Sequence, residues 1–238
     1  MKHLLFLLIP CLLFTSEPFF TFVDPPKEWL ISDPSKYEEG VKVAFIASKQ
    51  KVFTPSITLT IENVGKATMD DYVQALKRIY QADEFQELGI FTTSVGVAHL
   101  FQIDRNAQWG QMRLLQAITL YKGHALIQTG ACLKKDFLDV HETFLNTFKS
   151  LQTTPSLLTT CNHPTFEKRL ENITKCWKKL CATSKDDKKT LFNSPFFQDN
   201  QWKPFVSYIE KELKEKGLCW QFLALKYIQE SLLTENKP

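Results

Sequence analysis

The stretch that decides the fold runs from Ile90 to Leu151, and its centre, Met112–Ala131, reads MRLLQAITLYKGHALIQTGA. On both sides of Lys122-Gly123, alternate residues divide into two sets, which a period of two places on opposite faces of a strand. A two-residue connection joins antiparallel neighbours, because parallel strands need a longer crossover. Val95–Ile103 alternates in the same way, so the centre of the chain is predicted to be an antiparallel meander.

Helices and two further strands surround this meander in the sequence. The helix that follows it is predicted to begin after Lys134-Lys135-Asp136, because apolar residues then recur at helical spacing. Upstream, alternation predicts strands at 41–47 and 56–62, and the Thr68 hydroxyl is placed to cap a helix that starts there. Residues 25–152 are therefore predicted to form an α+β domain, an antiparallel β-sheet flanked by helices.

The remainder of the chain is predicted to be a small α-helical C-terminal domain, residues 156–238. The polar break Thr153–Ser156 marks the boundary. Beyond it, apolar residues recur at helical spacing in three runs, which predict three short amphipathic helices, each with one apolar face. These runs are Phe166, Leu170, Ile173, Trp177 and Leu180, then Phe205, Ile209 and Leu213, and finally Leu218, Phe222, Leu225, Ile228 and Leu232.

The N-terminus has the pattern of an export signal. Lys2 and His3 precede the apolar run Leu4–Phe14, which is shorter than the roughly 20 residues of a membrane-spanning helix. We therefore expect a signal peptide at residues 1–16, with a lipoprotein signal that ends in lipidation of Cys11 as the alternative. The expected location is the periplasm or cell envelope, with secretion as the alternative and peripheral membrane association open.

Four of the 6 cysteines lie in the last third of the chain. In an exported protein such clustering suggests disulfides. The candidates are Cys161, Cys176, Cys181 and Cys219. Their pairing stays open, and buried thiols or, less well, a zinc site are the alternatives. Cys132 ends a predicted strand and is expected to be a small buried hydrophobe.

No catalytic, cofactor-binding or metal-binding residue is predicted. The net charge of +3 is too mild to indicate nucleic-acid binding. His99 and His124 lie in predicted strands, where a structural histidine is the plainer interpretation. Cys161 and His163 are near neighbours in sequence, but catalytic Cys-His pairs usually meet in space from distant positions.

Several features of residues 25–152 occur in the same order as in a known family. Pro26 and Trp29 enter the domain, Thr68–Tyr72 starts its first helix, Gly123–Leu126 lies at the last hairpin, and Phe148–Leu151 ends the last helix. In this order and pattern the chain resembles the PsbP-like family. The resemblance implies an α/β/α sandwich, no shared catalytic residues, and a binding or accessory role.

Four functions remain open at this stage. The first is a non-enzymatic envelope or periplasmic protein that binds an unknown protein partner through the sandwich domain. The second is a secreted factor that acts on a host or neighbouring cell. The third is an enzyme with a dispersed site, such as Cys132 or Cys161 with a distant histidine. The fourth is a small-ligand carrier. The oligomeric state and the docking of the helical tail are also open.

Overall fold

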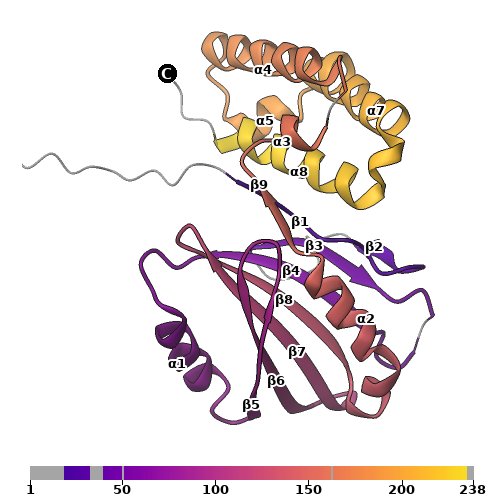
Figure 1. The fold of residues 1–238 in the computed structure, drawn as a ribbon. Coiled ribbons are helices and arrows are strands. Elements are labelled where there is room, and N and C mark those ends of the chain that lie inside the picture. Colours follow the sequence, from indigo (N-terminus) through magenta and orange to yellow (C-terminus); the bar gives the residue numbers. More distant parts are fainter. Residues whose placement is uncertain (1–18, 33–39, 50, 162, 235–238) are drawn as a thin grey trace, which may run out of the picture.

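A seven-stranded antiparallel sheet with the strand order β2-β3-β4-β8-β7-β6-β5 forms the larger part of the molecule (Figure 1). The computed structural model describes residues 19–32, 40–49, 51–161 and 163–234. The strands of the sheet are β2 (Leu30–Ser32), β3 (Val41–Ile46), β4 (Ser56–Asn63), β5 (Glu84–Thr92), β6 (Val97–Ala107), β7 (Gly110–Tyr121) and β8 (His124–Leu133). The predicted antiparallel meander is confirmed as strands β5 to β8.

The hairpin between β7 and β8 has the two-residue connection that the sequence predicted. Tyr121 pairs with His124, so that Lys122 and Gly123 form the turn. Both turn residues have positive φ, 46° and 75°, as a twist-matched two-residue turn requires. Gly123 also lies close to the Gly65 backbone, where a Cβ would approach the Gly65 carbonyl oxygen to 3.0 Å.

Helix α2 (Phe137–Lys149) covers one face of the sheet and follows a single 3-10 turn, Lys134–Asp136. Phe144 and Phe148 are fully buried between this helix and the sheet. The Phe144 ring lies directly over Gly130 of β8, in the space that a larger residue would fill. The end of the meander and the helix that follows it therefore build the main core together.

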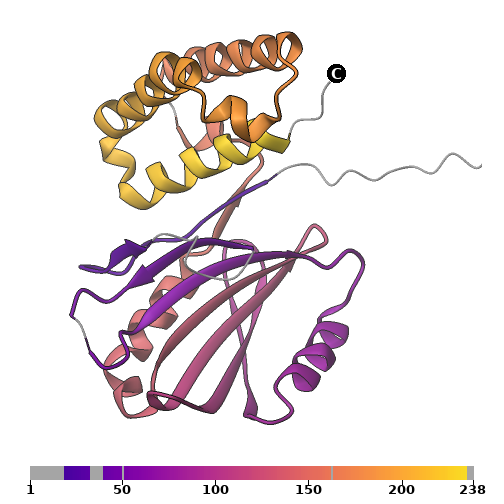
Figure 2. The same cartoon turned by 180° about the vertical axis from the view of Figure 1, so that it is seen from behind.

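Helix α1 (Met69–Ile79) lies on the opposite face of the sheet (Figure 2). Thr68 caps it: its hydroxyl accepts from the Asp71 amide, and the Asp71 carboxylate accepts from the Thr68 amide. Val73 and Leu76 pack on the sheet in a second, smaller core. With α2 on one face and α1 on the other, the predicted α/β/α sandwich is confirmed.

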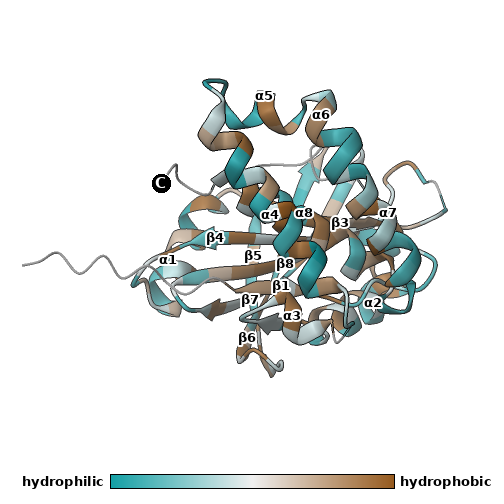
Figure 3. Cartoon of the chain, turned by 90° about the horizontal axis from the view of Figure 1, so that it is seen from above, coloured by the Kyte–Doolittle hydropathy of each residue, from teal (hydrophilic) through white to brown (hydrophobic). Residues whose placement is uncertain are grey.

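The chain after the sandwich is helical, as predicted. Its elements are α3 (Leu157–Thr160), α4 (Phe166–Thr183), α5 (Lys188–Phe192), α6 (Pro195–Phe197), the π-helical turn Gln198–Trp202, α7 (Lys203–Glu212), the 3-10 turn Lys214–Lys216 and α8 (Leu218–Thr234). In the view from above, α4 and α7 show mostly hydrophilic turns, and the strands beneath them are largely hydrophobic (Figure 3).

Helix α8 does not have the single apolar face that the sequence predicted. Leu218, expected in its seam, is 76% exposed, whereas Gln221 is buried and Leu223 is fully buried. The reason is that α8 packs against several elements, namely α5, α7, β1 and β3. A helix that is covered on several sides is apolar around its axis, so the spacing of its apolar residues does not define one face.

A two-stranded ribbon connects the sandwich to the helices. Strand β1 (Phe20–Phe22) pairs antiparallel with β9 (Gln152–Thr154), and the buried Thr21 lies opposite Thr153. Strand β1 lies before residue 25, where the predicted sandwich range begins. Three residues are too few to show a period of two, so the sequence indicated only an extended lead-in here.

The helical unit is docked on the sandwich, which the sequence left open. Lys42 of β3 forms an ion pair with Glu230 of α8 at 2.7 Å, and Lys226 donates to the Val41 carbonyl oxygen at 2.8 Å. The main hydrophobic core continues from the α2 face of the sheet through β1 into the helices. The two predicted domains therefore share one core.

Candidate functional site

A large concave surface of the sandwich lies between α1 and the sheet, and we call it the α1 groove. Its volume is about 910 Å³. It exists because one helix of 11 residues leaves much of this sheet face uncovered. Its lining comes from β3, β4, α1, β6, β7 and β8: Val41, Ser56, Thr58, Thr60, Glu62, Tyr72, Ala75, Leu76, Ile79, Tyr80, Arg105, Leu114, Gln116, Ile127, Thr129 and Ala131.

Polar side chains form the centre of the groove floor. Thr58, Thr129 and Gln116 lie opposite one another on β4, β8 and β7, so all three point to the α1 side of the sheet. The Gln116 Nε2 donates to the Thr129 hydroxyl at 3.2 Å and to the Tyr80 hydroxyl at 3.4 Å. Its Oε1 is buried and has no hydrogen-bond partner within the part of the chain that the structure describes. The floor is thus a hydroxyl-rich strip with one unsatisfied acceptor.

The wall of the groove is helix α1, which is fixed at its first turn. The Tyr72 hydroxyl donates to the Glu62 carboxylate of β4 at 2.8 Å. Burial is the largest cause that raises the pKa of Tyr72 well above its ordinary value, and the hydrogen bond to Glu62 raises it further. This hydroxyl therefore stays protonated. At the other end of the helix, Ile79 is 69% exposed and presents an apolar side chain at the rim. The groove therefore has a polar floor and a partly apolar wall.

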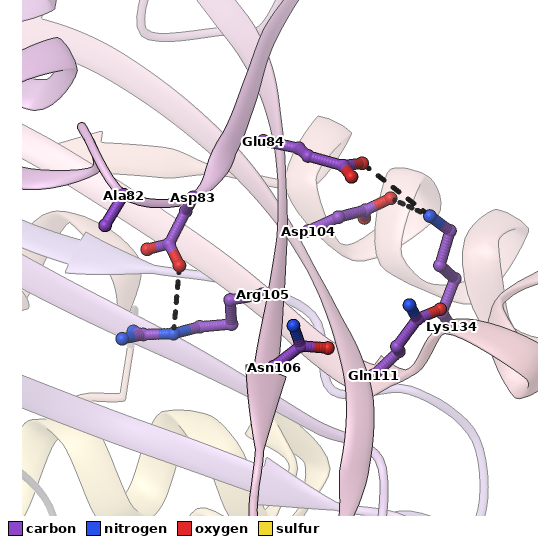
Figure 4. Close-up of a pocket in the computed structure, with 8 residues that line it drawn as sticks. All are labelled: Ala82, Asp83, Glu84, Asp104, Arg105, Asn106, Gln111 and Lys134. Atoms are coloured by element: carbon purple, nitrogen blue, oxygen red, sulfur yellow. Dashed lines mark ion pairs between the residues drawn. The ribbon is translucent and has the colours of Figure 1, made fainter.

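A second polar cluster surrounds Asp104 on the opposite face of the sheet, at the end of β6 (Figure 4). Arg113 binds the Asp104 carboxylate with two hydrogen bonds, at 2.7 and 2.6 Å, and Lys134 lies 2.8 Å from it. The hydrogen bond from Arg113 is the largest cause that holds the pKa of Asp104 below its ordinary value. Arg113 also lies over the Phe137 ring, at 4.8 Å. These contacts tie β6 and β7 to the start of α2.

The cavity beside this cluster is small, about 120 Å³. Asp83 and Arg105 face each other across it at 3.7 Å, and Glu84 reaches Lys134 at 3.8 Å (Figure 4). The cations and carboxylates of this cluster are paired with one another. We therefore interpret it as a structural ion-pair network, and the α1 groove remains the stronger candidate for binding.

The two strand histidines lie apart in the structure, and the candidate thiols Cys132 and Cys161 have raised pKa values. His99 of β6 and His124 of β8 are separated by strand β7. Burial raises the pKa of the Cys132 thiol to about 12, and burial also raises the pKa of Cys161. A thiol with a raised pKa is a poor nucleophile, because the thiolate is the reactive form. Cys132 is fully buried, as predicted.

The predicted disulfides are absent from the structure, which leaves Cys161, Cys176, Cys181 and Cys219 unbridged. Three of the four are buried, and Cys176 is partly exposed. Packing within one shared core explains their clustering without bridges. The Cys219 thiol, for example, donates to the Val23 carbonyl oxygen at 3.3 Å, and burial raises its pKa to about 12.

The remaining expectations from the sequence concern the N-terminus, metal binding and membrane spans. The predicted signal at residues 1–16 and the lipidation candidate Cys11 lie outside the described residues. Within the described ranges, no cluster of three or more histidine, cysteine or acidic residues is arranged to hold a metal ion. Among the helices of those ranges, none combines the length and apolarity needed to cross a membrane.

Comparison with known proteins gives similarity of fold only. No known protein-family profile matches the chain, and no curated protein matches it by sequence. Among solved structures, LpqN of Mycobacterium tuberculosis, "involved in cell envelope biogenesis", is 11% identical with a TM-score of 0.47, over 58% of this chain and 86% of LpqN.

Two named members of the family that the sequence resembles are also similar. PsbP of Synechocystis sp. PCC 6803 is 13% identical with a TM-score of 0.42, over 62% of this chain and 99% of PsbP. The Ran-binding protein Mog1p of Saccharomyces cerevisiae is 9% identical with a TM-score of 0.39, over 56% of this chain and 89% of Mog1p. The predicted resemblance thus recurs among solved structures, while the fold assignment rests on the strands and helices of this chain itself.

Proposed function

We propose that this chain is a non-enzymatic, exported protein of the periplasm or cell envelope that binds another protein through the α1 groove. The observation that carries the proposal is the groove itself, about 910 Å³ in volume, with a hydroxyl-rich floor and an apolar rim. Export is supported by the sequence of residues 1–16 alone.

A protein segment suits this surface better than a small molecule. Small-molecule sites are mostly apolar and enclose their ligand, with a few convergent polar groups. Here the polar residues Thr58, Thr60 and Thr129 are spread along two neighbouring strands. Such a strip can pair with the many polar groups of a polypeptide, while the exposed Ile79 offers an apolar contact of the kind that anchors interfaces.

The chemistry of the groove supports a binding role over catalysis. Its titratable residues are Glu62, Tyr72, Tyr80 and Arg105, and Glu62 is engaged by the Tyr72 hydroxyl. No histidine or cysteine occurs among the described residues that line it. A nucleophile with an adjacent base is the usual requirement for covalent catalysis. An enzyme with a dispersed Cys/His site remains the alternative, as does a secreted factor that uses the same export signal.

Site-specific photo-crosslinking in native cells tests the proposal. A photoreactive phenylalanine analogue replaces Ile79 at the rim of the groove, or Phe196 on α6 as a matched control, since both are apolar and more than half exposed. We expect a discrete crosslinked protein from position 79 alone, recovered with the envelope fraction. A crosslink in the culture medium only would favour the secreted alternative.

A blocking variant shows whether the crosslink depends on the groove. Ala75→Arg places a long side chain on the exposed, groove-facing side of α1, and Gln74→Arg adds the same charge at an exposed position outside the lining. Arginine is a good helix former, so both variants are expected to fold. The crosslink from position 79 should disappear with Ala75→Arg and persist with Gln74→Arg. Equal crosslinking in both variants would refute the groove as the binding site.

A further inference from the structure

Exposed apolar side chains and lysines occur on the β3–β4 connection, the β6–β7 hairpin and the start of α2. These three segments lie at the end of the sheet away from the helical unit (Figures 1 and 2). We call this surface the tip. It is made of Lys49, Lys51, Val52, Phe53, Trp109, Lys134, Lys135 and Leu138. Val52 is 75% exposed, Leu138 is 80% exposed and Trp109 is 45% exposed. Such exposure of three large apolar side chains at one end of a molecule marks an interaction surface.

Three connections that are distant in sequence build the tip. The β3–β4 connection meets the β6–β7 hairpin, where the Phe53 and Trp109 rings lie 5.4 Å apart. It also meets the start of α2, where Lys51 forms an ion pair with Asp136 at 3.2 Å. Trp109, Lys134 and Lys135 line one shallow hollow of about 460 Å³. The packing between these connections fixes the apolar and basic groups next to one another.

The charge that the tip offers to a ligand is positive. Asp136 balances Lys51, and Asp104 and Glu84 surround Lys134. Lys49 and Lys135 form no ion pair in the described part of the chain, and both are exposed. The exposed carboxylate of Asp139, next to Leu138, opposes this charge.

We propose that the tip binds the surface of a bilayer that contains anionic phospholipid. Tryptophan is enriched at the level of lipid headgroups, and lysines are attracted to anionic lipid. Val52 and Leu138 are exposed enough to enter the boundary between headgroups and acyl chains. A protein partner suits the tip less well, because lysine is depleted in protein–protein interfaces. This proposal uses other residues than the α1 groove and does not depend on it.

Sedimentation of the full chain with vesicles tests the proposal. The vesicles consist of phosphatidylcholine alone or of phosphatidylcholine mixed with phosphatidylglycerol. We expect binding to the mixed vesicles, and we expect it to weaken as salt rises above about 0.1 M, where charges more than about 10 Å apart are already screened. Equal binding to both kinds of vesicle would show that anionic phospholipid is not recognised and would overturn the proposal.

Charge variants locate the binding surface. Lys49→Glu with Lys135→Glu should weaken binding at least about 25-fold, because each basic residue near an anionic surface strengthens binding about five-fold. Lys175→Glu with Lys179→Glu on α4 changes the net charge equally, at exposed positions of the helical unit, and should leave binding nearly unchanged. Asp139→Asn should strengthen binding, by up to about five-fold from the same factor. An equal loss of vesicle binding in both double variants would show that only the net charge matters. It would overturn the assignment of binding to the tip.

Apolar variants test insertion separately from charge. Leu138→Ser at the tip and Leu218→Ser at the start of α8 change the same residue type at 80% and 76% exposure, so neither should unfold the protein. We expect at least about a five-fold loss from Leu138→Ser, because burial of a leucine in the interface is lost, and none from Leu218→Ser. The absence of any difference between the two would also contradict the proposal.

Discussion

At the scale of single residues, the contact of Phe144 with Gly130 decides how closely α2 approaches the sheet. A Cβ at position 130 would lie 2.5 Å from the nearest atom of the Phe144 ring. A Cβ atom does not come that close to an atom of another side chain in a folded protein, so the ring or the helix would have to move. Packing, and not backbone conformation, therefore requires glycine at position 130, because the backbone φ of this residue is ordinary.

We predict that Gly130→Ala destabilises the protein by about 1–3 kcal/mol, the usual cost of overpacking a core. Urea denaturation measures the change in the free energy of unfolding. The control is the same substitution in a Phe144→Ala background, where the cost should largely vanish because the clashing ring is absent. An equal cost in both backgrounds would mean that the contact with Phe144 is not the cause.

The second residue-scale prediction concerns Asp104. Its pKa is lowered in the folded protein, so its contribution to stability is present above the unfolded pKa of about 3.9 and is lost as pH falls through the lower folded value. Asp104→Asn should cost about 1–3 kcal/mol near pH 7, since the Arg113 guanidinium loses its charged partner.

The same pair of proteins checks the pH dependence. We expect the difference in unfolding free energy between wild type and Asp104→Asn to be constant from neutral pH down to about pH 4 and to shrink below it. Circular dichroism during urea titration at each pH gives this difference. If the difference in unfolding free energy between the two proteins does not change at acid pH, the Asp104 carboxylate is not stabilised in its charged form.

At the scale of elements, strand β1 is held by α8 as well as by its partner β9. The Tyr227 hydroxyl accepts from the Thr21 amide at 3.1 Å and donates to the Thr21 carbonyl oxygen at 2.8 Å. A single side chain thus satisfies both outward backbone groups of a buried strand residue. The Tyr227 ring also packs on Phe20 and Phe22.

We predict that Tyr227→Phe costs about 1–3 kcal/mol, because it leaves two buried backbone groups without partners while the ring remains. Hydrogen exchange of the Thr21 amide should accelerate in the variant. The control is Tyr121→Phe, since the Tyr121 ring packs on Phe19 at 5.1 Å and its hydroxyl forms no hydrogen bond to a strand within the part of the chain that the structure describes. Unchanged exchange at Thr21 would indicate that β9 alone holds β1.

At the scale of the whole molecule, the continuous core predicts that sandwich and helices unfold together. Leu223 of α8 is fully buried in the core that also contains Phe144 of α2. Leu223→Ala should cost about 2–5 kcal/mol, as is usual for a buried leucine. Hydrogen exchange in β8 and in α4 should accelerate by the same factor in this variant. Acceleration confined to α4 would show that the two parts unfold independently.

The sequence by itself determined most of the secondary structure and the fold class. A period of two defined β6, β7 and β8, because alternate residues of a strand point to opposite faces of the sheet. Helical spacing defined α1, α2, α4 and α7, because these helices bury one face and expose the other. Where that condition fails, the sequence misleads: α8 is covered on several sides, so Leu218 was wrongly expected to be buried. Strand β1 was missed because three residues carry no measurable period.

The candidate site and the cysteines depended on the tertiary structure. The α1 groove could not be predicted, because it is defined by how little of the sheet α1 covers, and Gln116 gave no local signal of its buried acceptor. The clustered cysteines suggested disulfides, yet the shared core buries three of the four, Cys161, Cys181 and Cys219, as unbridged thiols. Alternation and spacing report which side of an element is buried, whereas contacts between distant segments, such as Tyr227 with Thr21, depend on how complete elements pack.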